Sequence, residues 1–439
     1  MGNWLSTRVF RPIMIHATLA WEWWHSGVTY YPLAPRVYRN PYPTYAKLRT
    51  QDPVHWNFLG HSWVISRYPD IDAILRDHIR FSNDSRHRQG VSQAQVAASN
   101  PGGPSLLFLD PPDHTRLRAL VQQAFTPRAI EALTPRIRQI AANLLDRIAD
   151  PTAFEVMETL ARPLPMIVMA ELLGVPTQDL AQFQRWSRQR SRVIEPNMTA
   201  RERQLATQAA YELDAYFLSL IEQRRAKPRD DLISALVAAE SAGDQLSHDE
   251  LQVMLRLLLI AGNETTTNLI GNGLLALLRH PDQLQMLRAD PRLIAGAVDE
   301  LLRYDSPVQV LGRTALQDME VEGRSIRKGQ GIVLLLGSAN RDPEVYSQPD
   351  QLDVKRHGPS SLVFSRGIHH CLGAPLARLE ARIVIETLLE RFAEMRLLTA
   401  KPLFRDNVVL RGLAELPMSA TMPRVQRQTL PEAETSGLI

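Results

Sequence analysis

The sequence predicts a mainly α-helical protein with a small β region, folded as one body. Apolar residues recur at helical spacing over most of the chain after Pro41, whereas strand-like patterns are few. No internal repeat and no long Gly/Ser linker divides the 439 residues. Because 44% of the residues are apolar, one large helical core is possible.

We expect helices to follow one another along almost the whole chain. Their predicted ranges are 42–50, 69–76, 113–123, 127–149, 155–173, 178–192, 200–226, 248–279, 283–289, 291–304 and 375–392. Strands are expected at 54–57, 61–66, 319–321, 325–327 and 331–336, with a turn at Glu322 and Gly323. The predicted sheet is therefore small beside the helices.

The two ends of the chain differ from the rest, so residues 36–420 are expected to form the single main domain. Residues 1–35 form an extension with helically spaced apolar residues, namely Phe10, Ile13, Met14, Ala17, Trp21 and Trp24, while Arg8, Arg11, His16 and Glu22 lie elsewhere around the turn. We favour a helix packed on its own domain over a membrane-surface or partner-docking helix. Residues 421–439 are polar and are expected to form a flexible tail.

Composition excludes several classes of protein. The net charge is only +3, and Lys and Arg are spread along the chain, so binding to nucleic acid is not expected. No apolar run reaches the roughly 18 residues that a transmembrane span needs. The single cysteine cannot form an internal disulfide and suits a reducing, cytoplasmic protein.

The segment 248–279 is expected to form one long central helix. It opens with SHDE, in which Ser247 and Glu250 can form a capping box. At about 1.5 Å per residue the helix would run roughly 45–50 Å. From Leu251 to Ala261 it is apolar nearly all round, which predicts burial.

The motif AGNETTTN then places polar side chains in the middle of this buried helix, at a cost in free energy. Threonine hydroxyls could bond to earlier carbonyls and kink the helix beside a solvent-facing Glu264. Alternatively, Ala261 and Gly262 could form a groove for a small ligand, to which Glu264 and Thr265 relay protons. The motif alone does not decide between these explanations.

The only cysteine, Cys371, lies in FSRGIHHCLG, just before a predicted helix whose N-terminus favours a thiolate. A structural zinc site would need more ligands at tetrahedral spacing than His369, His370 and Cys371 can supply. A cysteine nucleophile with a histidine base is possible, but neighbouring residues on a tight loop usually point apart. A single thiolate ligand to haem iron fits best.

The motifs together resemble those of the cytochrome P450 family, in its soluble bacterial type. FSRGIHHCLG is similar to the haem-binding loop, AGNETT to the oxygen-binding helix motif, and ELLR to the family's Glu and Arg pair, which alone would indicate an ordinary salt bridge. DPPDHTRLRALVQQAF, RYDSPVQVLGRTA and LLLGSANRDP also resemble family segments, so the similarity covers residues 40–418. It implies the P450 fold, with a long central helix and a thiolate haem-binding loop.

The resemblance assigns roles to individual residues. It implies that Cys371 ligates the iron, that Glu264 and Thr265 deliver protons, and that Glu300, Arg303 and Arg356 brace the loop. The implied haem contacts are His114, Arg118, Ala261, Gly262, Arg313, Phe364, His369 and Gly373. The expected walls of the substrate pocket are Leu257, Ile260, Val308 and Val310, within a lining that also includes 86–107, Leu311 and 407–410. Ser365 departs from the family pattern, since many members have glycine there.

The implied function is a monooxygenase with haem b that inserts one atom of O2 into a hydrophobic small molecule, by hydroxylation or epoxidation. One cysteine cannot hold an iron–sulfur cluster, so electrons would come from a ferredoxin or flavodoxin with its NAD(P)H-dependent reductase, for which Arg366 and Arg378 could form a docking face unless they are simply solvated charges. The alternatives are a peroxide-driven peroxygenase, a non-oxidative haem-thiolate enzyme, and a haem-based sensor.

Overall fold

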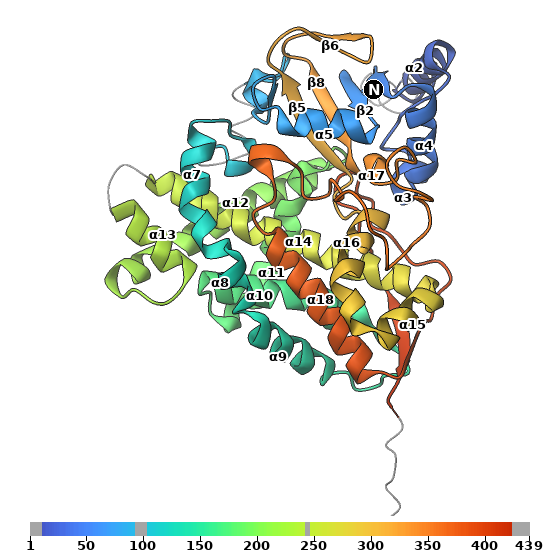
Figure 1. Cartoon of the computed structure of the whole chain (residues 1–439). Helices are drawn as coiled ribbons and strands as arrows, with labels where there is room; N and C mark the ends of the chain where they lie inside the picture. Colours follow the sequence, from blue (N-terminus) through green and yellow to red (C-terminus); the bar gives the residue numbers. More distant parts are fainter. Residues whose placement is uncertain (1–10, 93–102, 242–245, 424–439) are drawn as a thin grey trace, which may run out of the picture.

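A 32-residue helix, α14 (His248–Arg279), runs through the interior of the protein and confirms the predicted central helix. The computed structural model describes residues 11–92, 103–241 and 246–423. Figure 1 shows α14 surrounded by other helices, with the strands gathered mainly at one end. Ser247 and Glu250 form the predicted capping box at the start of α14. The mainly helical fold class is thus confirmed.

The other helices and the strands have the following bounds. The helices are α2 (Arg11–Ser26), α3 (Pro35–Arg39), α4 (Tyr42–Gln51), α5 (Tyr68–Arg76), α7 (Asp113–Gln122), α8 (Pro127–Glu131), α9 (Thr134–Leu145), α10 (Pro163–Leu173), α11 (Leu180–Ser191), α12 (Ala200–Ala226), α13 (Leu232–Ser241), α15 (Pro281–Ala289), α16 (Ile294–Tyr304), α17 (Leu336–Ala339) and α18 (Ala374–Arg391). The strands are β1 (Val54–Asn57), β2 (Ser62–Ile65), β3 (Phe81–Ser82), β4 (Phe154–Glu155), β5 (Val310–Ala315), β6 (Met319–Val321), β7 (Arg324–Ile326), β8 (Gly331–Leu335), β9 (Glu394–Leu397) and β10 (Pro417–Thr421).

The main sheet has the strand order β1-β2-β8-β5-β3. β2 and β8 are parallel, and the other neighbours are antiparallel. β5 was not predicted, because Gly312 and Arg313 interrupt the apolar alternation on which a strand prediction depends. This strand matters for the site, since it carries Arg313 into the interior of the protein.

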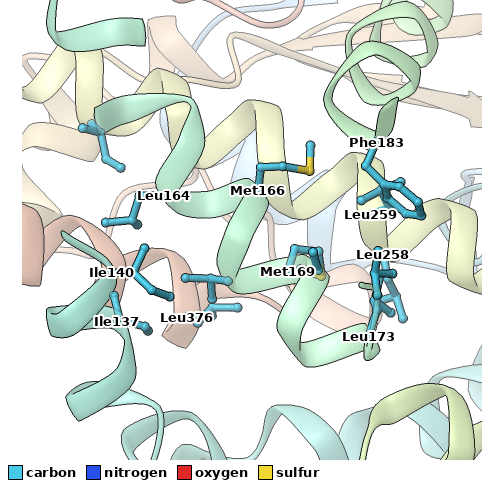
Figure 2. Close-up of a cluster of buried hydrophobic side chains, with 14 of the residues drawn as sticks. Ile137, Ile140, Leu164, Met166, Met169, Leu173, Phe183, Leu258, Leu259 and Leu376 are labelled. Atoms are coloured by element: carbon cyan, nitrogen blue, oxygen red, sulfur yellow. The ribbon is translucent and has the colours of Figure 1, made fainter. Parts of the chain in front are cut away.

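The helical core packs against one side of α14. Figure 2 shows Ile137 and Ile140 of α9, Leu164, Met166, Met169 and Leu173 of α10, Phe183 of α11, and Leu376 of α18 gathered with Leu258 and Leu259 of α14. All are buried. Because this cluster joins α14 to α18, it fixes the long helix relative to the loop that precedes α18.

Several predicted boundaries differ from those observed. The expected helix at 127–149 divides into α8 and α9, and Pro135 stands in the first turn of the second helix, a position that suits proline. The expected helix at 155–173 starts instead with β4 and a π-helical turn before α10. Helix α13 was missed, although Asp231 caps it by accepting a hydrogen bond from the Ser234 N–H at 2.8 Å.

The N-terminal extension contains the expected helix, α2, but much of its apolar stripe faces away from the domain. Glu22 is buried, whereas Met14, Trp21 and Trp24 of the apolar stripe are exposed. The helix is held on its own domain through Glu22, whereas Met14 and Trp24 of the apolar stripe are not part of the packed face. Phe10 lies outside the described residues. At the other end β10 includes Thr421, and 424–439, most of the expected tail, also lie outside them.

Candidate active site

The loop from Phe364 to Gly373 holds Cys371 directly before α18. The Cys371 N–H donates to the Phe364 carbonyl oxygen at 2.8 Å and closes the loop. Gly367 has a φ of +64°, and a Cβ at this position would lie 2.8 Å from the Leu75 carbonyl oxygen. Glycine is therefore required both by the backbone conformation and by the close approach of α5.

The Cys371 side chain has accessible surface. Protein nevertheless surrounds the thiol closely enough that burial raises its pKa. The N–H groups of Gly373 and Ala374 and the charges of Arg118 and Arg378 act in the opposite direction and lower this pKa. The surroundings thus suit a thiolate once a cation binds it.

Cationic and hydrogen-bond-donating side chains from separate parts of the chain meet near this loop. His114 of α7 lies against His369, with ring centroids 4.2 Å apart. Burial and the neighbouring Arg118 lower the pKa of His114 to about 4. Burial and the charges of His114 and Arg313 lower the pKa of His369 to about 3. Burial also lowers the pKa of Arg313 to about 10. An anion lying between these groups would favour their protonated forms.

The same cluster contains buried polar atoms without partners. Both ring nitrogens of His114 and Nε2 of His369 make no hydrogen bond with any of the described residues. Arg118 donates to the His370 carbonyl oxygen at 2.7 Å. Asp110, which sequence reasoning missed, has its oxygens occupied by Ser82 and the Asn83 N–H. The cluster therefore fits the two propionates of a haem, and Cys371 fits its iron.

One face of α14 is open at the AGNETT motif. Ala261 is exposed, and Leu257, Ile260 and Thr265 are partly exposed, although this helix is otherwise mostly buried. Leu257, Ala261 and Thr265 are spaced four residues apart, and Ile260 follows Leu257 by three, so these positions share a face. The Thr265 hydroxyl donates to the Ala261 carbonyl oxygen at 2.8 Å, and the segment stays α-helical throughout.

Gly262 serves the packing of α10 on α14. A Cβ added at Gly262 would come 2.3 Å from the terminal methyl group of Met169. The small residue therefore leaves room for this methionine.

Glu264 is neither solvent-facing nor free. It is buried, and its carboxylate accepts a hydrogen bond from Arg405 in the C-terminal loop. Burial and the nearby Arg162 lower the pKa of Arg405 to about 10. The kink explanation, which required a solvent-facing Glu264, is thus wrong on this point. No sequence motif marks Arg405, which lies 141 residues further along the chain.

Glu300, Arg303 and Arg356 come together as predicted, in the interior of the protein. Glu300 accepts from Arg303 Nε at 2.6 Å and Nη2 at 2.8 Å, and both of its oxygens lie 3.1 Å from Arg356 Nε. The Asp353 N–H adds a further bond to Glu300, at 2.9 Å. Because the pair is buried, it differs from the surface salt bridge that its spacing alone would indicate.

A chain of hydrogen bonds joins this network to the cysteine loop. Arg303 Nη1 donates to the Asn340 carbonyl oxygen at 2.9 Å. Asn340 Oδ1 accepts from the Leu362 N–H at 2.7 Å, and the Leu362 carbonyl oxygen accepts from the Ser365 N–H at 2.8 Å. Ser365 adjoins Phe364, whose carbonyl oxygen holds the Cys371 N–H. The three charged residues are thus linked to the cysteine loop through Asn340.

Two other residues predicted to line the substrate pocket, Val308 and Val310, lie in different surroundings. Val308 forms a bridge with Leu410 of the C-terminal loop. Val310 packs with the cluster around Tyr30 and Tyr45, and alternation along β5 puts it on the opposite face from Arg313.

The two candidate docking arginines are already engaged within the chain. Arg366 bonds to Asp72 at 3.2 Å, and Arg378 bonds to Asp299 at 2.8 Å. Both arginines are thus paired within the chain, although the pair of Arg378 with Asp299 is exposed to solvent.

Comparisons with known proteins agree with this arrangement. A model of the family described as Cytochrome P450 matches residues 49–409. The polyketide biosynthesis cytochrome P450 PksS of Bacillus subtilis is 42% identical over 405 residues, covering 89% of this chain and 98% of that protein. Its solved structure gives a TM-score of 0.83 and covers 90% of this chain and 100% of that one.

Two further relatives show the same match over most of their length. The vitamin D(3) 25-hydroxylase of Pseudonocardia autotrophica is 41% identical over 388 residues, covering 87% of this chain and 94% of that protein. The structure of P450BioI in complex with a hexadec-9Z-enoic acid ligated acyl carrier protein gives a TM-score of 0.82 at 38% identity, covering 88% of this chain and 100% of that one. The chain therefore belongs to the cytochrome P450 family of haem-containing monooxygenases.

Proposed function

We propose that this enzyme inserts one oxygen atom from O2 into a hydrophobic small molecule, and that residues 36–420 form its catalytic unit. The observation that carries this proposal is the cluster of Arg118, His114, His369 and Arg313 beside Cys371, with buried ring nitrogens that lack partners among the described residues. In the proposed assignment Cys371 ligates the iron of haem b, and His114, Arg118, Arg313 and His369 hold the propionates. When bound, haem supplies the activation of O2.

Several residues of the chain would position the substrate and the protons. Leu257 and Ile260 offer an apolar surface beside Ala261, which favours a hydrophobic substrate. Hydroxylation of such a molecule is consistent with the name of the vitamin D(3) 25-hydroxylase relative. The Thr265 hydroxyl would pass protons at its Oγ1. Glu264 would supply them when Arg405 releases its carboxylate.

We further propose that electrons come from a separate ferredoxin or flavodoxin with its NAD(P)H-dependent reductase. The sequence has one cysteine and no recognisable flavin segment, so the chain has no cluster of its own to deliver electrons. Arg366 is largely covered and bonded to Asp72, which makes it a poor candidate for the docking face. Arg378 is more exposed beside Asp299 and stays a candidate.

The first experiment tests the ligand and the relay. Purified protein should give the carbon monoxide difference spectrum of a haem thiolate, and Cys371→Ala should lose it. Substrate candidates are then ranked by the shift in iron spin state that they cause. With a surrogate ferredoxin and reductase, Thr265→Ala should keep its haem. It should form less product per electron supplied and more hydrogen peroxide. An unchanged product yield per electron would refute the relay.

A peroxide-driven peroxygenase is the second candidate, and the ion pair between Glu264 and Arg405 favours it. If this pair stays closed during turnover, proton supply through Glu264 is cut off. Turnover with hydrogen peroxide and no reductant, at a rate that Glu264→Gln leaves unchanged, would establish this alternative. Loss of reductant-driven turnover in Glu264→Gln would support the monooxygenase.

A further inference from the structure

The exposed side chains of α2 are mostly apolar, apart from His16 and His25. Trp24 is 80% exposed, Met14 67%, Trp23 61% and Trp21 44%. Ala17 and Ala20 lie between them on the same side of the helix and are also exposed. For comparison, Trp186 in the helical core is 2% exposed. A contiguous exposed patch of this kind marks an interaction site.

A buried carboxylate holds the helix in this orientation. Glu22 is 1% exposed and accepts hydrogen bonds from the Phe58 N–H at 3.0 Å and the Tyr30 N–H at 3.3 Å. His55 Nε2 lies 3.6 Å from the same carboxylate. The single acidic side chain of α2 therefore fastens the helix to the body of the protein, and the tryptophans are left outside.

The patch continues from α2 onto the edge of the main sheet. Trp21 contacts Phe58 edge-to-face, with ring centroids 4.1 Å apart, and Phe58 contacts Trp56 in the same way at 6.1 Å. Trp56 in turn contacts Trp63 at 5.1 Å. β1 and β2, which frame this turn, form one edge of the five-stranded sheet. Figure 1 shows α2 at the periphery, near this edge.

The segment of the sequence that contains the patch is rich in basic residues. Residues 1–51 contain six basic residues, namely Arg8, Arg11, Arg36, Arg39, Lys47 and Arg49, and one acidic residue, Glu22, which gives a net charge of +5. The whole chain carries only +3, so residues 52–439 carry −2. Arg36, Arg39 and Lys47 are exposed, whereas Glu22 is buried.

Tryptophans beside basic residues are typical of segments that lie at the headgroup level of a membrane. We propose that α2, the aromatic side chains of the β1–β2 hairpin and the exposed basic residues Arg36, Arg39 and Lys47 form a docking surface for an anionic lipid bilayer. The helix lies in the plane of the surface, because its 16 residues would reach only about 24 Å. Among the described residues no helix meets the requirements of a membrane span. The family match begins at residue 49, so α2 is outside the matched region.

The test uses the full-length haem-loaded protein and vesicle flotation. One set of vesicles contains phosphatidylcholine alone, and the other also contains phosphatidylglycerol. We expect the protein to float with the anionic vesicles and to be released by high salt, because screening weakens the attraction of the basic residues. Trp23→Glu with Trp24→Glu should lower the bound fraction about tenfold or more. Ala20→Asp places a single negative charge on the same face of α2, and it should also lower the bound fraction.

The control variant removes two exposed apolar side chains from a different helix, α12. Tyr211 and Leu218 are exposed on α12, and Tyr211→Ala with Leu218→Ala should bind vesicles as the wild type does. The proposal is overturned if the wild type stays unbound, or if the tryptophan variants bind as well as it does. A wild-type dimer that the tryptophan variants abolish, without vesicle binding, would overturn it in favour of a second copy of the chain.

Discussion

Replacing Glu300 by alanine should destabilise the protein severely and loosen the cysteine loop. The change leaves two guanidinium groups, of Arg303 and Arg356, without their carboxylate in a buried site. Breaking a buried ion pair costs about 3–5 kcal/mol. Several backbone carbonyls still accept hydrogen bonds from both arginines, so we take about 3 kcal/mol. The Asp353 N–H also loses its acceptor, which adds about 1 kcal/mol.

The expected loss of about 4 kcal/mol is a large share of the 5–15 kcal/mol that typically holds a protein folded. It should be measured by urea unfolding, together with the fraction of protein that retains its haem. The control is Glu394→Ala, which removes a single ion pair with Arg396 in which both side chains are exposed. That change should cost less than about 1 kcal/mol. If Glu300→Ala cost no more than the control, the reasoning from burial would be wrong.

Three further predictions follow from single residues. Ser365 has a φ of +61° and a buried hydroxyl that lacks a partner among the described residues. Ser365→Gly should therefore raise the free energy of unfolding, measured by urea titration, by about 1 kcal/mol. A fall in this free energy would contradict the prediction. The pKa of His114 is about 4, below the ordinary value of about 6.5. Below about pH 6.5 the unfolded chain therefore takes up a proton that the folded chain does not. The stability of haem-free protein should fall as the pH drops towards 4. His114→Leu should flatten this slope, and an unchanged slope would refute the assignment. Arg405→Leu leaves Glu264 buried and unpaired, which should lower the free energy of unfolding by about 3 kcal/mol. Adding Glu264→Leu should recover part of this stability. If it does not, loss of the ion pair is not the cause of the destabilisation.

The features that the sequence predicted correctly are those in which neighbouring residues cooperate. The capping box of α14 needs only Ser247 and Glu250, and the cysteine loop is compact enough for its glycines, histidines and cysteine to be recognised together. The resemblance added His114 and Arg313, which the structure brings to His369 although they are 199 residues apart in the sequence. Spacing alone would not have joined them.

The features that were missed depend on partners from distant segments. Asn340 connects Arg303 to the cysteine loop through its backbone oxygen and its side chain, and nothing in its local sequence indicates this role. Glu195, between α11 and α12, accepts hydrogen bonds from three consecutive N–H groups, those of Val408, Val409 and Leu410. Such contacts follow from the tertiary fold, so a pattern that considers a few turns at a time cannot find them.

The N-terminal helix shows a different limit of pattern reasoning. An apolar stripe indicates that a helix has an interface, but it does not say whether the interface is the protein's own core. In α2 the decision depends on Glu22, because a carboxylate can be buried only where donors meet it, and the N–H groups of Tyr30 and Phe58 do so. Once Glu22 turns inward, helical geometry forces Trp24 outward. The stripe was therefore detected correctly, but its direction could not be, since one donor lies in the segment between α2 and α3 and the other in the turn of the β1–β2 hairpin.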